Sequence, residues 1–332
     1  MNKLNEKTNI RTLEKADLEA AKLLWLASFP DDDEVFVDYY FRARTSPERM
    51  LGLFVSEGEA GERGEGSEKL VSMLCFEALF MRVSKEKSAR VAFVAGVCTF
   101  PEYRRRGYVR RLLSELEARL APLGVEAMVL QPFDFGFYEK LGFKAFAVRN
   151  MCVLKKTGDW LVDPFNKSEC CSPKSAGENA HEMPLDAENL YRIYGAYTES
   201  LCGTLTRTRE KCAAVIEEYA VCGGRSLAVK TNSGEAYALW YGGDEADENA
   251  DESAEKAPVR LDEFAFTSEG AASELILRIL DEAGAVKLPL PTIASLFCGE
   301  CRSERFNMLK PIGRRRFEEF LGEREPFELQ RY

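Results

Sequence analysis

The arginine-rich segment PEYRRRGYVRRLL, residues 101–113, constrains the fold more than any other part of the chain. It separates an apolar, β-rich run, ARVAFVAGVCTF, from a pattern with helical spacing. One apolar stripe along that pattern consists of Val109, Leu112, Leu113, Leu116 and Leu120. We therefore expect a strand, a short turn at Gly107, and an amphipathic helix that packs against a sheet.

This turn has the features of an anion site. The first turn of a helix leaves backbone N–H groups without partners and carries the positive end of the helix dipole. Five arginines in thirteen residues add charged donors at the same place, although the chain as a whole carries a net charge of -10. We interpret the turn as a site for a di- or polyphosphate. The alternative is a solvated basic face that pairs with neighbouring acids.

The charge and composition of the whole chain narrow the possible partners. An acidic protein disfavours nucleic acid and anionic lipid, whereas it attracts cationic small molecules and lysine-bearing peptides. No apolar stretch reaches the roughly 18 residues that a membrane helix needs, and the N-terminus lacks a signal-peptide core. We expect a cytosolic protein that binds neither nucleic acid nor membranes.

The ten cysteines show no dense disulfide spacing and are expected to be reduced thiols. Cys298 and Cys301 form a CGEC motif with zinc-like spacing, but a structural zinc site needs a second pair. No such pair precedes or follows them, so no metal is expected.

The order of elements suggests two domains in 332 residues. Residues 1–160 form the first, residues 161–183 a polar linker, and residues 184–332 a second domain that repeats the first faintly. Where the first copy has its arginines, the second has Ser268, Glu269 and Gly270. The second domain should therefore not bind the anion.

Two motifs in sequence resemble the GNAT acetyltransferase superfamily. In VAGVCTFPEYRRRGYVRRLL, residues Arg104, Gly107 and Val109 match the three marked positions of R/Q-x-x-G-x-G/A, with Val109 replacing the usual small residue. FYEKLGF then follows in the expected place. The arrangement of the whole chain resembles the enhanced intracellular survival (Eis) family, without the third, sterol-carrier-like domain that its members usually carry.

The resemblance implies an α/β (α+β) fold with two tandem GNAT-like domains. Each is a mixed, mostly antiparallel sheet flanked by helices. The first binds acetyl-CoA as co-substrate, and the second, degenerate domain contributes to the acceptor pocket.

The resemblance also implies the residues that bind the cofactor. The coenzyme pyrophosphate contacts the arginine turn, the pantetheine arm runs along the preceding strand, and two further residues follow the next strand. In chain order these residues are Val97, Cys98, Thr99, Arg105, Arg106, Gly107, Tyr108, Val109, Arg110, Phe133 and Asp134.

For catalysis, the resemblance assigns Tyr138 as the general acid that protonates the coenzyme A sulfur. The base is less well defined. His181 is the only histidine and lies in the linker, so it is excluded. The terminal carboxylate of Tyr332 is the named candidate, in competition with Glu77, the acids at residues 31–34, and water. Cys98 lacks a histidine partner, which favours direct transfer.

These features predict an N-acetyltransferase that moves an acetyl group to a primary amine, such as an aminoglycoside, a polyamine or a peptide lysine. The alternative is a non-catalytic sensor that binds acyl-CoA or a protein partner. A nucleic-acid binder is disfavoured by the acidic remainder of the chain. Assembly into a homo-oligomer is left open.

Overall fold

The computed structural model describes residues 7–56, 68–84, 86–157, 160–162, 180–199, 201–242, 258–289 and 302–313. These residues divide into two compact units. Unit 1 contains the described residues up to Phe80, Ala89–Ala145, and the segment that begins at Asn307. Unit 2 contains Met81–Ser88 and the described residues of Phe146–Phe306. The predicted boundary near residue 160 differs from this division, and the prediction did not place residues after 306 in the first unit.

Unit 1 is built on the strand order β1-β2-β3-β4-β5-β14. The strands are β1 (Thr8–Thr12), β2 (Met50–Ser56), β3 (Glu68–Arg82), β4 (Ser88–Thr99), β5 (Ala127–Leu130) and β14 (Arg302–Pro311). The pairs β1/β2, β2/β3 and β5/β14 are antiparallel, whereas β4/β5 is parallel. This mixed, mostly antiparallel sheet confirms the predicted fold class.

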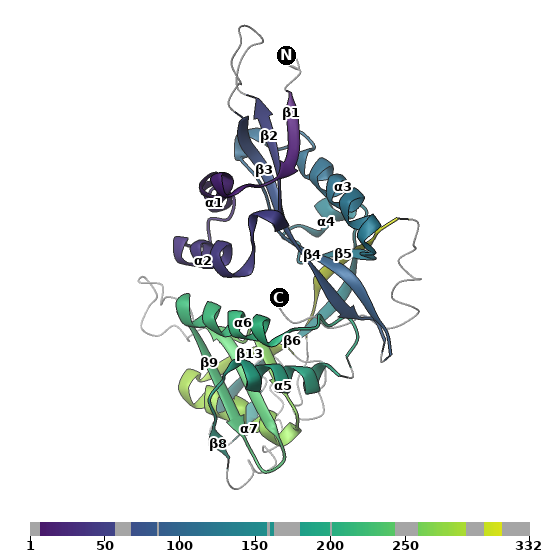
Figure 1. Cartoon of the computed structure of the whole chain (residues 1–332). Helices are drawn as coiled ribbons and strands as arrows, with labels where there is room; N and C mark the ends of the chain where they lie inside the picture. The colour runs from purple at the N-terminus through teal and green to yellow at the C-terminus, as the bar shows by residue number, and fades with distance from the viewer. Residues whose placement is uncertain are drawn as a thin grey trace. The chain divides into compact units, whose positions relative to one another are not determined.

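Helices cover both faces of this sheet (Figure 1). They are α1 (Leu18–Leu26), α2 (Glu34–Tyr39), α3 (Tyr108–Leu120) and α4 (Phe135–Glu139). One π-helical turn, Tyr40–Arg44, extends α2. The hydrophobic cores show the same arrangement. The helices α1 and α2 pack with Met73, Cys75 and Cys98 on one face of the sheet. The helix α3 packs with Leu74 and Val94 on the opposite face. The predicted stripe on α3 is confirmed, because Leu112, Leu113, Leu116 and Leu120 are buried and Val109 packs against the same core.

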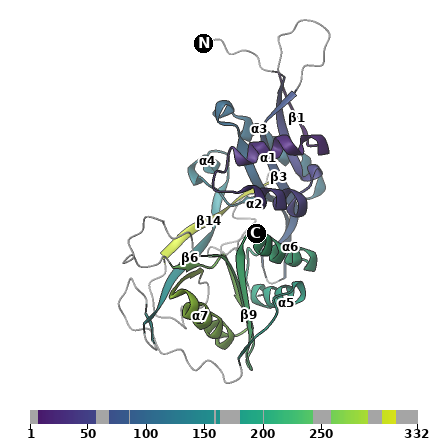
Figure 2. The same cartoon turned by 90° about the vertical axis from the view of Figure 1, so that its left-hand side faces the viewer.

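The strand β14 comes from the far end of the chain and completes unit 1. It pairs with β5 from Met308 opposite Leu130 to Pro311 opposite Ala127. Figure 2 shows it as the yellow strand. Met308 and Ile312 join the core under α3, and Lys310 forms an ion pair with Glu117 of α3 at 2.7 Å. The first unit is therefore not a contiguous segment of the sequence.

Unit 2 contains two groups of strands. The first is a four-stranded sheet in the order β12-β10-β9-β8. Its strands are β8 (His181–Glu182), β9 (Gly224–Lys230), β10 (Glu235–Tyr241) and β12 (Glu263–Phe266). In the second group, β13 pairs with β6 and β11, and β7 pairs with β6. These strands are β6 (Lys144–Thr157), β7 (Trp160–Val162), β11 (Val259–Arg260) and β13 (Ala285–Pro289).

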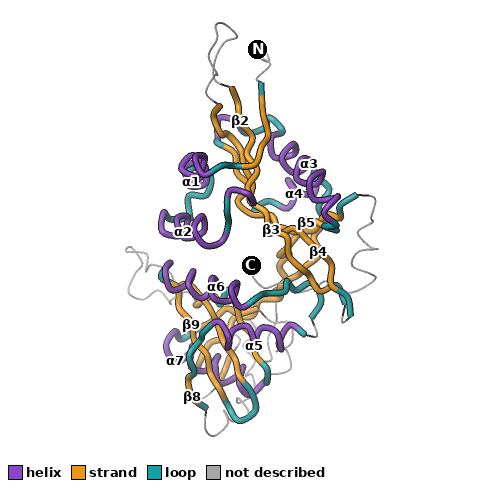
Figure 3. Tube along the Cα trace, in the orientation of Figure 1, coloured by secondary structure: helices purple, strands orange, loops and turns teal. Residues whose placement is uncertain are grey.

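Three helices sandwich the four-stranded sheet of unit 2 (Figure 3). They are α5 (Ala187–Thr198), α6 (Arg209–Val221) and α7 (Glu269–Ala283). The helices α5 and α6 pack on the face that carries Tyr237 and Leu239, whereas α7 packs on the face that carries Ala236 and Ala238. Successive side chains of β10 point to opposite faces of the sheet, so they belong alternately to these two cores.

A buried ion pair fixes the segment before α6. Both Arg207 Nη atoms contact the Glu263 carboxylate, at 2.7 and 2.8 Å, and neither side chain is more than 3% exposed. The Arg207 guanidinium also lies 4.3 Å from the ring centroid of Tyr194, and Tyr237 donates a hydrogen bond to Glu263. Because a buried carboxylate needs such partners, these contacts hold α5, β10 and β12 in one arrangement.

Candidate active site

The site begins where β4 and β5 part. The two strands are paired in parallel over three residues each, from Val91 opposite Ala127 to Phe93 opposite Val129. Beyond Phe93, β4 continues to Thr99, whereas the described pairing with β5 ends. The sequence-predicted residues Val97, Cys98 and Thr99 lie on this continuation. A strand edge without a neighbour can take an extended ligand as an additional strand.

Gly96 interrupts the regular geometry of β4 at this point. Its φ is +56°, in the left-handed region, and a Cβ placed there would lie 2.3 Å from Cζ3 of Trp25. Only glycine combines this conformation with the close approach of the Trp25 ring. The aromatic cluster around Trp25 thus packs directly on the backbone at the bend. A glycine inside a β-rich run was visible in the sequence but was not recognised there.

Side chains hold the end of β4. Ser72 of β3 contacts Thr99 Oγ1 at 2.8 Å and donates to the Cys98 carbonyl at 3.0 Å. Arg104 Nε donates to the Thr99 carbonyl at 3.1 Å. Arg104, which matches the first motif position, therefore ties the turn to the strand before it. Ser72, a polar residue in the apolar run LVSMLCF, was missed by the sequence analysis.

The turn between β4 and α3 has an unusual backbone. Arg105 has φ +63°, and Gly107, the residue that precedes α3, has φ +78°. Left-handed residues in a short turn direct successive backbone N–H groups toward one point, which suits an anion. A non-glycine residue in this region costs about 1–3 kcal/mol, and such strain is concentrated at functional sites. Among the described residues, no side chain caps the first turn of α3.

The arginines of the turn are arranged around it. Arg106 donates to the Glu102 carbonyl at 2.9 Å and stacks on the Tyr103 ring, and Arg110 reaches the Lys140 carbonyl at 3.5 Å. Arg105 is exposed and has no ion pair or side-chain hydrogen bond to the described residues. Arg105 is therefore solvated, as the alternative interpretation expects, but it does not pair with an acidic side chain of the described residues. The charge is available to an anion at the start of α3.

Tyr138 lies in α4, next to the end of β4. It is 8% exposed and packs edge-on against Phe137 and Phe143, with ring centroids 5.0 and 5.7 Å apart. Burial raises the pKa of the Tyr138 phenol, and the nearby Cys98 thiol raises it further. The pKa of Cys98 is itself raised, chiefly by burial. Tyr138 belongs to the core under α3, against which Val97 of the β4 edge also packs, and both the Tyr138 phenol and the Cys98 thiol are protonated at neutral pH.

The other predicted residues near α4 have different surroundings. The Asp134 carboxylate caps α4 by accepting a hydrogen bond from the Phe137 N–H at 3.1 Å. Phe133 is 99% exposed. Tyr108 is buried in the core under α3, so only its backbone faces the turn.

The candidate bases are dispersed. Glu77 forms an ion pair with Arg49 at 2.6 Å. Asp32 accepts a hydrogen bond from Trp25 Nε1, and Asp33 caps α2. His181 is an exposed residue of β8. Tyr332 lies outside the described residues, as do Cys298 and Cys301.

Within the part of the chain that the structure describes, no group of three or more His, Cys, Asp or Glu side chains could hold a metal ion. None of the described helices is long and apolar enough to cross a bilayer.

The corresponding position in unit 2 is built differently. There Ser268 caps α7 by accepting from the Ala271 N–H at 3.1 Å, and Ser233 of the β9–β10 turn contacts Ser268 at 3.1 Å. A Cβ at Gly270 would lie 2.8 Å from Ser233 Oγ. The β9–β10 turn therefore occupies the space beside the helix start. Together with the negative charge of Glu269, this packing disfavours a pyrophosphate at α7.

Comparison with known proteins shows what this region resembles. Residues 9–146 match the family model described as an acetyltransferase (GNAT) domain. The match includes β1, the arginine turn and α4. This region is therefore similar to a GNAT acetyltransferase domain. No curated protein matches the chain.

Solved structures share the fold at low sequence identity. A GCN5-related N-acetyltransferase from Kribbella flavida is 18% identical with a TM-score of 0.66, over 93% of this chain and 72% of that chain. A probable N-acyltransferase from Enterococcus faecalis V583 is 13% identical with a TM-score of 0.68, over 92% and 72%. Eis1 from Mycobacterium abscessus is 16% identical with a TM-score of 0.64, over 92% of this chain and 74% of that chain. These structures confirm the predicted GNAT-like fold, and an Eis protein is among the structural neighbours.

Proposed function

We propose that this protein transfers an acetyl group from acetyl-CoA directly to a primary amine, with an aminoglycoside, a polyamine or a peptide lysine as the acceptor class. The proposal is supported mainly by three features of unit 1. These are the β4 edge beyond Phe93, the strained turn at Arg105 and Gly107, and Tyr138 beside Cys98.

The proposal assigns each part of the coenzyme to one feature. The pyrophosphate contacts the backbone N–H groups at the start of α3 and the guanidinium of Arg105. The pantetheine arm lies along the β4 edge from Val97 to Thr99, as an additional strand. The thioester then lies near Tyr138, because Tyr138 is close to Cys98 at the end of that edge.

The chemical step follows from this placement. The neutral amine nitrogen attacks the thioester carbonyl carbon, the carbon–sulfur bond breaks, and the Tyr138 phenol gives its proton to the departing sulfur. The nitrogen loses its proton to solvent water, and a second solvent proton restores the phenol. Because its pKa is raised, the Tyr138 phenol keeps its proton until the thiolate forms. Deprotonating a lysine-like amine at pH 7 costs about 4–5 kcal/mol, which favours activity at alkaline pH.

The experiment measures coenzyme affinity and turnover separately. Calorimetry with coenzyme A compares the wild type, Arg105→Glu and a control, Arg225→Glu, which makes the same charge change at an exposed position of unit 2. We expect Arg105→Glu to weaken affinity at least tenfold and the control to bind normally, because the loss of one charge-assisted contact has about this effect. Equal affinity of all three proteins would contradict the assigned pyrophosphate position.

Turnover is followed by the release of free thiol from acetyl-CoA with a panel of primary amines. We expect Tyr138→Phe to retain coenzyme affinity and to lose roughly 100-fold or more in kcat, since general acid catalysis contributes about that much. A wild type that binds acetyl-CoA but releases no thiol with any amine would instead identify a non-catalytic sensor.

A further inference from the structure

Asn307 of β14 is a buried polar residue that the site described above does not use. Its side chain is almost fully buried, with 2% of the residue exposed, and its Oδ1 has no hydrogen-bond partner among the residues that the structure describes. Two other buried oxygens of the described residues share this property, Ser28 Oγ and Thr45 Oγ1. Each of those lies against a thiol, Cys98 and Cys75 respectively. Since buried amide oxygens in native proteins nearly always accept a hydrogen bond, Asn307 needs an explanation.

The strand register places Asn307 beside the opening between β4 and β5. Met308 is paired with Leu130, the last residue of β5, so Asn307 lies one residue beyond the final pair. The strands β5 and β14 are neighbours, about 4.8 Å apart. Asn307 therefore sits within one strand spacing of the point where β5 ends.

The face of the sheet is also defined. Met308 and Ile312 pack in the core under α3. Because successive side chains of a strand point to opposite faces, Asn307 points away from α3. Cys98 belongs to the core on that same opposite face, together with α1 and α2. Asn307 and the end of the β4 edge are thus on one side of the sheet.

We propose that Asn307 is a substrate-binding residue whose Oδ1 accepts a hydrogen bond from an N–H group of the bound reactants. This inference rests on the acetyl-CoA site proposed above. Two N–H sources share the required chemistry, an amide of the pantetheine arm and the acceptor amine. Either donor would satisfy an oxygen that the folded chain leaves without a partner.

The test uses the full chain and the variant Asn307→Leu, which keeps the branched shape and the number of side-chain heavy atoms and removes the oxygen. An unsatisfied buried oxygen destabilises the ligand-free protein, so we expect Asn307→Leu to raise the melting temperature. The control is Thr198→Val in unit 2, which removes a buried hydroxyl that does donate, to the Tyr194 carbonyl at 2.7 Å. That variant should lower the melting temperature.

Binding then identifies the donor. If a pantetheine amide is the donor, Asn307→Leu weakens coenzyme A binding about tenfold without any acceptor present. If the acceptor amine is the donor, coenzyme A binds normally and kcat/KM for the amine falls about tenfold. Asn307→Asp keeps an oxygen at the same place and should recover most of the loss, including in a case where the leucine variant does not fold.

Two results would overturn the inference. One is an Asn307→Leu protein with unchanged coenzyme affinity and unchanged kcat/KM, which would make Asn307 a residue of the core only. The other is a wild type that does not bind coenzyme A, which removes the proposed function and this inference together. The wild-type titration therefore distinguishes the two failures.

Discussion

At the scale of single residues, the site depends on positions where the backbone is forced into a conformation that few residues adopt. Arg105, Gly96 and Gly107 all have a positive φ. Arg105 is strained in this conformation because it has a Cβ atom, whereas the two glycines are not. The strained backbone of Arg105 lies where the binding of a charged ligand would offset its conformational free energy. Gly96 has a different purpose, because the Trp25 ring occupies the space that a side chain would need.

The substitution Gly96→Ala tests this packing. We expect it to lower the free energy of unfolding by about 2–4 kcal/mol, because the left-handed conformation and the collision with Trp25 both oppose a methyl group. The control is Gly124→Ala, where φ is +72° but no heavy atom lies within 4 Å of the added Cβ. It should cost about 1 kcal/mol. Urea unfolding of the two variants checks the difference. An equal decrease in the free energy of unfolding would show that the Trp25 ring moves aside to admit the methyl group.

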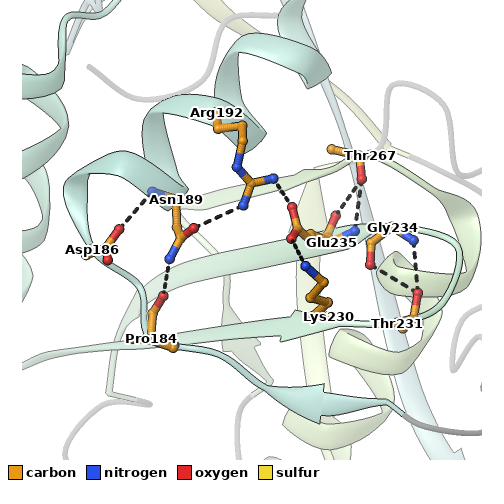
Figure 4. Close-up of polar contacts among 9 residues, drawn as sticks. All are labelled: Pro184, Asp186, Asn189, Arg192, Lys230, Thr231, Gly234, Glu235 and Thr267. Carbon is orange, nitrogen blue, oxygen red and sulfur yellow. Dashed lines mark hydrogen bonds and ion pairs between the residues drawn. The ribbon is translucent and has the colours of Figure 1, made fainter.

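At the scale of elements, the β9–β10 turn of unit 2 is held by a polar network (Figure 4). Glu235 lies between Arg192 of α5, to which it is hydrogen-bonded, and Lys230 Nζ, at 3.2 Å. Its backbone N–H donates to Thr267 Oγ1 at 2.9 Å. The turn itself closes through the Thr231 N–H and the Gly234 carbonyl at 2.8 Å. These contacts keep the turn beside the start of α7.

This network predicts a pH dependence of stability. The Arg192 hydrogen bond, with help from Lys230, lowers the pKa of Glu235 below its ordinary value of 4.5. A lowered folded-state pKa stabilises the protein above pH 4.5, and this contribution is lost as the pH falls through the folded-state pKa.

Glu235→Gln should therefore reduce the free energy of unfolding by on the order of 1 kcal/mol at pH 7, and the difference from wild type should shrink as the pH falls below 4.5. The control is Glu188→Gln, whose partner Arg209 and carboxylate are both more than half exposed. That pair should contribute little at either pH. Urea unfolding at pH 7 and pH 4 checks both variants, and a pH-independent loss in Glu235→Gln would contradict the ionic role.

The elements of unit 1 could be predicted from the sequence because their signals are local. The helical stripe of α3 and the arginine turn both follow from the spacing of nearby residues. The role of β14 could not be predicted, because nothing within RSERFNMLKP states that its partner is β5, more than a hundred residues earlier. The candidate site was incomplete for the same reason: Ser72 and Asn307 reach it only through strand pairing.

At the scale of the whole molecule, unit 1 requires both early and late segments of the chain. The strand β14 supplies Met308 and Ile312 to the core under α3, and it covers the edge of β5. A piece that contains only residues 1–160, the range predicted as the first domain, lacks both contributions. An uncovered strand edge also pairs readily with other chains.

We therefore expect residues 1–160 alone to aggregate or to unfold without cooperativity. Supplying residues 302–313 through a flexible linker after residue 160 should restore part of the cooperative transition. Circular dichroism during heating, together with sedimentation, checks both forms. A soluble 1–160 fragment that unfolds as sharply as the full chain would show that β14 is dispensable.

The late position of β14 also has a consequence during synthesis. While the ribosome is still producing residues between β5 and β14, the nascent chain holds α3 and the arginine turn but lacks the strand that secures β5. Coenzyme binding should consequently appear only after β14 has left the ribosome, which stalled nascent chains of increasing length would reveal. Until then, the exposed β5 edge is a natural contact for chaperones.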